Sequence, residues 1–172
     1  MADTIDMLIS EEQITARIKE LAKQINSDYA EKSVILIITL KGACFFACEL
    51  AKHLTMPVFM EYIQMTSYEG KSSNGTIIMK LDVPNEIIVG KHVIILEDVI
   101  DTGKTLTSIK NIMLEKKPAS LAICSLLDKH ECRVVPFEGD YIGFTIGDDF
   151  VVGYGLDWDQ KYRNLPYIGI VR

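Results

Sequence analysis

The chain has 172 residues, of which 48 % are hydrophobic and 24 % are charged. This balance is typical of one folded globular domain over residues 1–172 and excludes a disordered chain. The formal net charge of −6 opposes long-range attraction to nucleic acid and to anionic lipid. We therefore expect neither a nucleic-acid nor a membrane partner, and any bound phosphate must be held by local groups.

Helices and strands alternate from the start of the chain. Ser10 and Gln13 have the spacing of a capping box, and apolar residues at helical spacing predict a helix over residues 10–30. Residues 34–38 are a continuous β-branched run suited to a strand covered on both faces. Residues 43–54 have the pattern of a second helix.

The same alternation continues along the rest of the chain. Alternating strands and helices predict an α/β fold with a mostly parallel sheet. The last forty residues have the pattern of short strands and turns, and we expect residues from roughly 130 to 172 to form a small hood with the N-terminal segment. The intervening elements are a strand after Pro57, a turn at Asn74-Gly75 into a strand over 76–81, a strand over 92–96, a helix over 106–115 and a strand over 121–127.

The four cysteines and the first residues of the chain give information on the cellular compartment of the protein. Cys44 and Cys48 share one face of the expected helix, but no His or Cys at ligand spacing completes a metal site there. With Cys124 and Cys132 they are expected to be reduced thiols. The first residues lack the basic and apolar regions of a secretory signal, so we expect a cytoplasmic protein.

A candidate phosphate-binding loop, Asp101-Thr102-Gly103-Lys104-Thr105, follows the strand over 92–96. In open α/β sheets ligands bind where strands end and helices begin, and N–H groups at a helix start suit a phosphate. A Walker A loop also ends in Gly-Lys-Thr, but it needs a glycine where this chain has Asp98. The sequence therefore argues against a kinase-like nucleotide-binding module.

Two carboxylates, Glu97 and Asp98, immediately precede this loop. Buried carboxylates are costly unless a cation or a hydroxyl group meets them. Ribose hydroxyls can donate to them, and Mg²⁺ favours carboxylate and phosphate oxygens together. A solvated strand end is the alternative interpretation. The adjoining loop favours a ligand that carries both sugar and phosphate.

The segment from Ile94 to Thr105 resembles the phosphoribosyl pyrophosphate motif of type I phosphoribosyltransferases. Over about residues 34–170 the chain is similar to the hypoxanthine-guanine branch of that family. The resemblance implies the type I phosphoribosyltransferase fold and a Mg²⁺-dependent transfer of phosphoribosyl from phosphoribosyl pyrophosphate to a 6-oxopurine. Further matching segments are Leu40-Lys41-Gly42, Ser67-Tyr68, Leu126-Leu127-Asp128-Lys129, 150–157 and Tyr162-Arg163-Asn164-Leu165.

The resemblance also implies a role for each matching residue. Asp101 corresponds to the general acid/base at purine N7, a role compatible with a helix N-cap, and the loop at Lys41-Gly42 corresponds to one with a non-proline cis peptide. The implied ligands are Glu97, Asp98, Asp101, Thr102, Gly103, Lys104 and Thr105 for the phosphoribosyl group; Lys41, Gly42 and Arg163 for pyrophosphate; Lys129, Phe150, Val151 and Asp157 for the purine; Glu97, Asp98 and Asp157 for the metal; and Ser67 and Tyr68 for a lid.

Lys129 supplies the chemical reason for preferring a 6-oxopurine. An ammonium group has three donors and no acceptor, so it suits the 6-oxo group of hypoxanthine or guanine and not the 6-amino group of adenine. One alternative is a nucleotide-sensing, RNA-binding regulator of the same fold with weak uracil transferase activity, which would need a basic surface. The family resemblance implies a homodimer or homotetramer.

Overall fold

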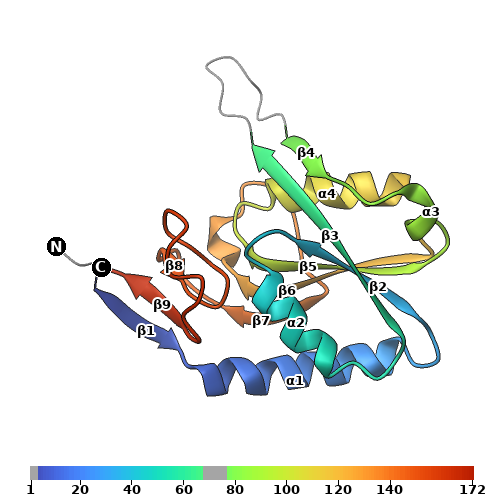
Figure 1. Ribbon diagram of the computed structural model, residues 1–172. Helices are drawn as coiled ribbons and strands as arrows, with labels where there is room; N and C mark the ends of the chain where they lie inside the picture. Colours follow the sequence, from blue (N-terminus) through green and yellow to red (C-terminus); the bar gives the residue numbers. More distant parts are fainter. Residues whose placement is uncertain (1–3, 68–76) are drawn as a thin grey trace, which may run out of the picture.

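The computed structural model describes residues 4–67 and 77–172. Its main feature is a six-stranded sheet in the order β4-β3-β2-β5-β6-β7 (Figure 1). Strand β2 pairs in parallel with β3 and β5, and the parallel pairing continues from β5 to β6 and β7, which confirms the mostly parallel sheet. The strands are β2 Val34–Thr39, β3 Val58–Ser67, β4 Ile77–Leu81, β5 His92–Ile100, β6 Ser120–Asp128 and β7 Tyr141–Thr145.

The strand order reverses at β2. The chain runs from β2 to β3 on one side, and β5 then pairs with the other side of β2. The carboxyl ends of parallel strands flanking such a reversal leave a crevice, which is where open α/β sheets bind ligands. The topology therefore directs the search for a site to the residues that follow β2 and β5.

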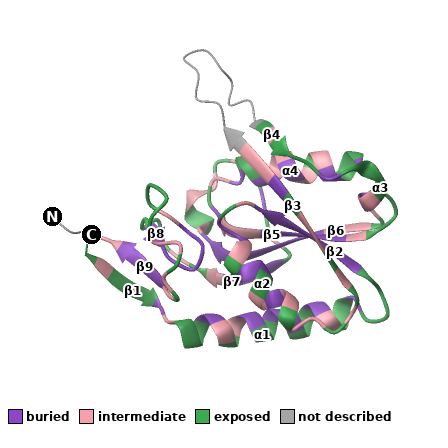
Figure 2. Cartoon of the chain, viewed as in Figure 1, coloured by how far each residue is buried: buried purple, intermediate pink, exposed green. Residues whose placement is uncertain are grey.

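Helices cover both faces of the sheet, as Figures 1 and 2 show. The period of two in the central strands sends Leu36 and Ile38 toward one core and Ile35 and Ile37 toward the other, so all six residues of β2 are buried. Burying such a side chain contributes about 1.5–3 kcal/mol. The helices are α1 Glu11–Asp28 and α2 Cys44–Lys52 on the first face and α3 Asn85–Ile88 and α4 Lys104–Glu115 on the second.

A small antiparallel sheet in the order β1-β9-β8 forms the hood (Figure 1). It joins β1 (Ile5–Ile9) to β9 (Ile168–Val171) and to the two-residue strand β8 (Val151–Val152). The hood expected from about residue 130 included β7, whereas β7 pairs with β6 in the main sheet. The C-terminal strands of the separate small sheet thus begin only after β7.

Several predicted boundaries shift because of tertiary pairing. The capping box at the start of α1 is present, with Ser10 Oγ accepting from Gln13 N. Strand β5 continues past residue 96 to Ile100 because β6 supplies ladder partners as far as Asp128. The turn expected at Asn74-Gly75 lies outside the described residues. Within the described part of the chain, no helix is long and apolar enough to cross a bilayer.

Candidate active site

Several of the predicted site residues lie at one edge of the main sheet, where the parallel strands β2, β5 and β6 end (Figure 1). Thr39 is the last residue of β2, and Asp128 is the last residue of β6. Because parallel strands end at the same edge, segments that are far apart in sequence meet there. The hood lies beside this edge.

The acidic pair lies inside β5 and not after it, because the strand continues to Ile100. Thr39 Oγ1 donates to Glu97 Oε1 at 2.7 Å, and Asp98 N donates to the same oxygen at 3.1 Å. Burial, together with the neighbouring Asp98 carboxylate, raises the pKa of Glu97 well above its usual value. The pair therefore favours a ligand that brings positive charge or hydrogen-bond donors.

The candidate phosphate loop is shorter than expected. Gly103, with a φ of +82°, is the residue before α4, so Lys104 and Thr105 lie in the first helical turn. The N-cap position belongs to Gly103, which corrects the expectation that Asp101 would be compatible with that position. A small cavity opens at this turn, lined by Glu97, Val99, Ile100, Asp101, Thr102, Gly103, Thr105 and Leu106.

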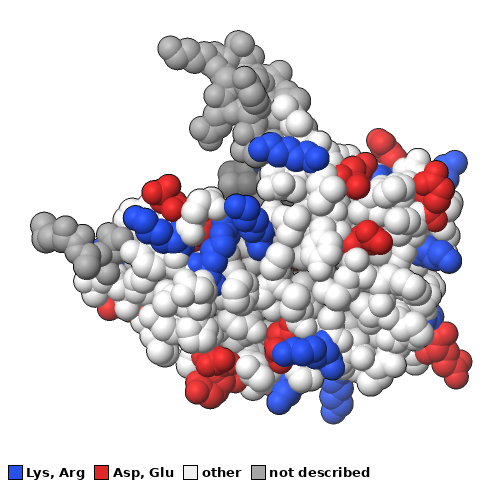
Figure 3. All heavy atoms as spheres, in the orientation of Figure 1, with Lys and Arg blue, Asp and Glu red and all other residues white. Residues whose placement is uncertain are grey.

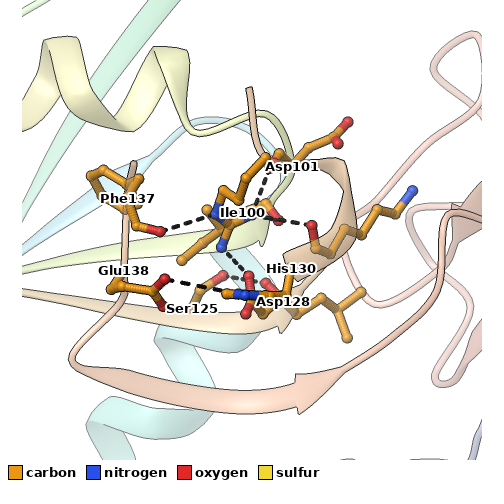
Figure 4. Close-up of polar contacts among 10 residues, drawn as sticks. Ile100, Asp101, Ser125, Asp128, His130, Phe137 and Glu138 are labelled. Carbon is orange, nitrogen blue, oxygen red and sulfur yellow. Dashed lines mark hydrogen bonds and ion pairs between the residues drawn. The ribbon is translucent and has the colours of Figure 1, made fainter. Parts of the chain in front are cut away.

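Arg133 ties this loop to the end of β6, and the family resemblance gave no role to it. Its side chain is only 11 % exposed and forms an ion pair with Asp128, which is 8 % exposed. Figure 4 shows how Ile100, Asp101, Asp128 and Phe137 converge on these contacts. The guanidinium donates to the carbonyl oxygens of Ile100 (2.9 Å), Asp101 (2.5 Å), Lys129 (3.3 Å) and Phe137 (3.0 Å).

A sequence signal for Arg133 did exist. Asp128 ends an apolar strand run, and a buried carboxylate there needs a counter-charge. An arginine five residues later can supply it if the chain turns back. The short 3₁₀ helix His130–Cys132 makes that turn.

The loop after β2 contacts both β5 and the hood. The peptide bond between Leu40 and Lys41 is cis, in the loop where the resemblance implied such a bond. A Cβ added to Gly42 would lie 1.5 Å from Asp98 Oδ2, and one added to Gly155 would lie 2.0 Å from Gly42 O. Only glycine allows these close approaches. The loop is therefore packed between the acidic pair and the hood.

The cationic groups predicted to bind pyrophosphate have partners in the hood. Lys41 Nζ donates to Gln160 Oε1 at 3.0 Å. Arg163 pairs with Asp157 at 2.6 Å and donates to Gly155 O at 2.6 Å. Arg163 Nε is buried and has no hydrogen-bond partner in the described part of the chain. Asp157 and Arg163, expected to bind metal and pyrophosphate separately, thus neutralise each other in this structure.

Of the predicted purine ligands other than Asp157, Lys129 directly follows β6, and Phe150 and Val151 lie at the beginning of β8 in the hood. Lys129 Nζ donates to Asp149 O at 2.8 Å, and Phe150 is 55 % exposed. The Trp158 ring packs edge-on against Phe150, with centroids 6.1 Å apart. Val151 is buried and pairs with β9, which fixes the backbone beside Phe150. Lys129 and an exposed aromatic ring therefore flank one place on the hood side of β6.

Three further expectations concern the lid, the cysteines and the metal. Ser67 is the last residue of β3, and Tyr68 lies outside the described residues. All four cysteines are free thiols in this structure. In residues 4–67 and 77–172, no three His, Cys, Asp or Glu side chains form a ready-made metal site.

The fold and the site can now be compared with known proteins. The model of the phosphoribosyl transferase domain matches residues 5–159, which is most of the chain. The chain therefore belongs to the phosphoribosyl transferase family. The match includes β1 and the loop after β2, as well as the loop after β5.

Individual relatives and solved structures indicate which branch of the phosphoribosyl transferase family the chain resembles. The chain is 46 % identical over 171 residues to a hypoxanthine-guanine phosphoribosyltransferase of Streptococcus pneumoniae, covering 99 % of this chain and 94 % of the relative. A crystal structure of a hypoxanthine-guanine phosphoribosyltransferase from Bacillus anthracis matches with a TM-score of 0.92 and 42 % identity over 99 % of both chains. A Trypanosoma cruzi hypoxanthine phosphoribosyltransferase structure, studied for the role of its C-terminal region in oligomeric state and activity, matches with a TM-score of 0.91 and 40 % identity over 97 % of this chain and 91 % of that chain. These similarities place the chain in the hypoxanthine-guanine branch.

Proposed function

We propose that this protein transfers the 5-phosphoribosyl group of phosphoribosyl pyrophosphate to N9 of hypoxanthine, and of guanine, in purine salvage. The N9–C1′ bond forms, the bond from C1′ to the pyrophosphate oxygen breaks, and the products are IMP or GMP and pyrophosphate. The observation that carries this proposal is a backbone hydrogen bond of 2.9 Å from Lys129 N to Ile100 O. This bond supports the proposal because it holds Lys129, the proposed base-selecting residue, beside the proposed phosphate-binding loop.

The 5′-phosphate is proposed to bind at the loop after β5. Thr102, Gly103 and Thr105 line the small cavity there, and the N–H groups at the start of α4 suit an anion. Charge-assisted hydrogen bonds contribute about 1.5–3 kcal/mol each, more than the helix dipole. The ribose hydroxyls would donate to Glu97 and Asp98 next to this cavity.

Asp101 is proposed to accept the proton that the purine loses at N7. Its side chain is exposed, so it is open to a substrate. Proton transfer by a positioned side chain typically contributes about 10²–10⁴ in rate. Arg133 donates to the carbonyl oxygen of Asp101, so this contact holds the backbone and does not itself occupy the carboxylate.

Departing pyrophosphate would be stabilised by Lys41 and Arg163. A planar guanidinium binds phosphate oxygens in a bidentate manner, and the buried Nε–H of Arg163 is a donor without a hydrogen-bond partner in residues 4–67 and 77–172. Both cations would exchange their present partners, Gln160 and Asp157, for the leaving group. The segment at Ser67 and Tyr68 is proposed to be the lid that excludes water from C1′.

We propose Mg²⁺ as the cofactor, held by Glu97, Asp98 and Asp157. Mg²⁺ keeps several waters and commonly binds one or two carboxylates plus substrate phosphates, so it needs no complete protein cage. The paired carboxylates in β5, where burial raises the pKa of Glu97, have oxygen donors that fit such an ion. When bound, the ion would offset the negative charge of the pyrophosphate group.

Base selection is assigned to Lys129, with Phe150 stacking on the ring and the Val151 backbone meeting its edge. Lys129 already donates to Asp149 O, so its ammonium is oriented toward the hood. An incoming 6-oxo group offers an acceptor to this ammonium, and a 6-amino group does not. Asp157, at the end of the same hood segment, would complete the purine site.

A base panel tests the activity. The protein is mixed with Mg²⁺, phosphoribosyl pyrophosphate and hypoxanthine, guanine, xanthine, adenine or uracil, and absorbance is followed. We expect turnover with hypoxanthine and guanine and at most weak turnover with adenine and uracil. Turnover with uracil alone would contradict the proposal.

The RNA-binding alternative is less consistent with the surface. The chain carries a net charge of −6, and on the face shown in Figure 3 the basic groups are scattered among acidic groups and form no continuous patch. The relatives compared above carry the names of phosphoribosyltransferases. A salt-dependent RNA gel shift is the discriminating measurement. A cytoplasmic location and a homodimer or homotetramer remain proposals, and light scattering tests the oligomeric state.

A further inference from the structure

We infer that Arg133 is a positioning residue for the transfer reaction, holding the Asp101 loop and Lys129 in one fixed arrangement. The inference rests on the proposed function, because it concerns the distance between the acid/base group and the base-selecting ammonium. Arg133 itself has its N–H groups directed to protein acceptors. It would therefore act through its neighbours.

The contacts of Arg133 bridge the ends of two adjacent strands. On the β5 side its Nη1 donates to the carbonyl oxygens of Ile100 and Asp101, and on the β6 side it donates to that of Lys129. Its Nη2 pairs with Asp128. The strand ladder ends where Ile100 pairs with Asp128, so beyond that point the segments that follow β5 and β6 are joined by other contacts.

The same side chain also supports the left-handed turn at Gly103. A Cβ added to this glycine would lie 3.4 Å from Arg133 Cδ and 2.9 Å from Phe137 Cβ. Arg133 Nε donates to Phe137 O, so the residues that surround Gly103 are held by the guanidinium. Backbone bonds from Lys129 N to Ile100 O (2.9 Å) and from Val134 N to Thr102 O (3.1 Å) complete the junction.

Only an arginine can make this set of contacts. Its five N–H groups lie in a rigid plane, and charge-assisted hydrogen bonds are shorter and stronger than neutral ones. A lysine at position 133 would keep the charge for Asp128 but would have three donors on one nitrogen, too few for all the carbonyl groups. The loop carrying Asp101 would then lose part of its support, while the buried carboxylate kept a partner.

The functional consequence follows from the precision that proton transfer requires. A misplacement of about 1 Å can lower a rate by about 10²-fold even when substrate still binds. Arg133 fixes the backbone of Asp101 and leaves its carboxylate exposed. Loss of the arginine should therefore lower kcat much more than it raises KM for phosphoribosyl pyrophosphate.

Arg133→Lys tests this, with Arg17→Lys as the matched control. Arg17 also donates to two backbone carbonyl groups, of Gly143 (2.8 Å) and Ile142 (2.8 Å), and pairs with Glu20, but it joins α1 to β7 away from the site. We expect Arg133→Lys to lower kcat by about 10- to 100-fold. Arg17→Lys should leave kcat unchanged although it also lowers the melting temperature.

A double variant separates positioning from general loss of structure. If Arg133 acts through Asp101, adding Arg133→Lys to the Asp101→Asn enzyme should lower kcat hardly any further. The effects of substituting residues that act as one unit are not additive. The inference would be overturned if the loss of kcat in the double variant equalled the product of the two single losses. A normal kcat in Arg133→Lys would also overturn it.

Asp128→Asn is the second variant if Arg133→Lys does not fold. It removes the ion-pair partner and retains the carbonyl contacts, so we expect a smaller loss of kcat that is again non-additive with Asp101→Asn. If the losses of kcat in Asp128→Asn and Asp101→Asn were independent in the double variant, the positioning role of Arg133 would be contradicted. A wild-type protein without transferase activity would refute the proposed function, whereas an active wild type with an unaffected Arg133→Lys refutes only this inference.

Discussion

The loop after β5 and the hood loop between β8 and β9 both carry predicted substrate ligands, but they are held in different ways. The first has one left-handed residue, Gly103, and its backbone is fixed by the buried Arg133. In the hood loop, four residues other than glycine have positive φ: Tyr154, Asp159, Gln160 and Tyr162. Its ligand Asp157 is held by a pair with Arg163, and its residue Gln160 binds Lys41.

This difference fits the two tasks proposed for these loops. A group that transfers a proton must keep one position, so it benefits from contacts to the backbone that leave its side chain free. Groups that receive a leaving group must change partner during the reaction. Side-chain pairs such as Asp157 with Arg163 can do this, because each partner can be replaced by a ligand of the same charge.

The largest expected effect comes from Asp101→Asn. An amide cannot accept the N7 proton, so kcat should fall by about 10²–10⁴-fold while KM for phosphoribosyl pyrophosphate changes little. Steady-state kinetics with hypoxanthine measure both. The control is Asp159→Asn, the same replacement at an exposed position of the hood loop. Unchanged turnover in Asp101→Asn would remove this residue from the mechanism.

Lys129→Met should have the next largest effect. Loss of a charged hydrogen bond to the 6-oxo group corresponds to about 1.5–3 kcal/mol, or about 10- to 150-fold in kcat/KM for hypoxanthine. The preference for hypoxanthine over adenine should narrow. Lys161→Met, an exposed hood lysine, is the control. An unaltered preference between the two bases would show that selection lies elsewhere.

The geometry of the first loop is tested by Gly103→Ala against Gly90→Ala. Both glycines have positive φ, +82° and +69°, so each alanine costs about 1–2 kcal/mol of unfolding free energy. A Cβ at Gly103 also meets Phe137 at 2.9 Å, whereas one at Gly90 meets nothing within 4 Å. Urea unfolding should show a larger loss for Gly103→Ala, with kcat lowered in that variant alone. Equal losses of unfolding free energy in the two variants would mean that Phe137 can move away from the added Cβ at little cost.

Gln160→Ala should have the smallest effect and tests partner exchange in the hood. On the proposed mechanism Lys41 would give up its hydrogen bond to Gln160 when pyrophosphate binds, and because both side chains are exposed to solvent this bond is worth only about 0.5 kcal/mol. KM for pyrophosphate in the reverse reaction should therefore fall about twofold. A rise would show that Gln160 helps to hold Lys41 for the leaving group.

Local sequence determined the framework of this protein. The apolar runs 34–38 and 92–96 specify strands buried on both faces, and Ser10 with Gln13 specifies the start of α1. A loop after the strand over 92–96 is also indicated by its residues, although Lys104 and Thr105 belong to the first turn of α4. These features depend on periods of two and 3.6 and on local turn chemistry.

Tertiary structure decided how the site is assembled. The length of β5 depends on how far β6 continues beside it, and the role of Arg133 depends on its approach to Ile100, a residue 33 positions earlier. The pairing of Asp157 with Arg163 likewise depends on a loop with left-handed residues. A sequence pattern records which groups are present, but the acceptor that a buried charge meets is set by contacts between distant segments.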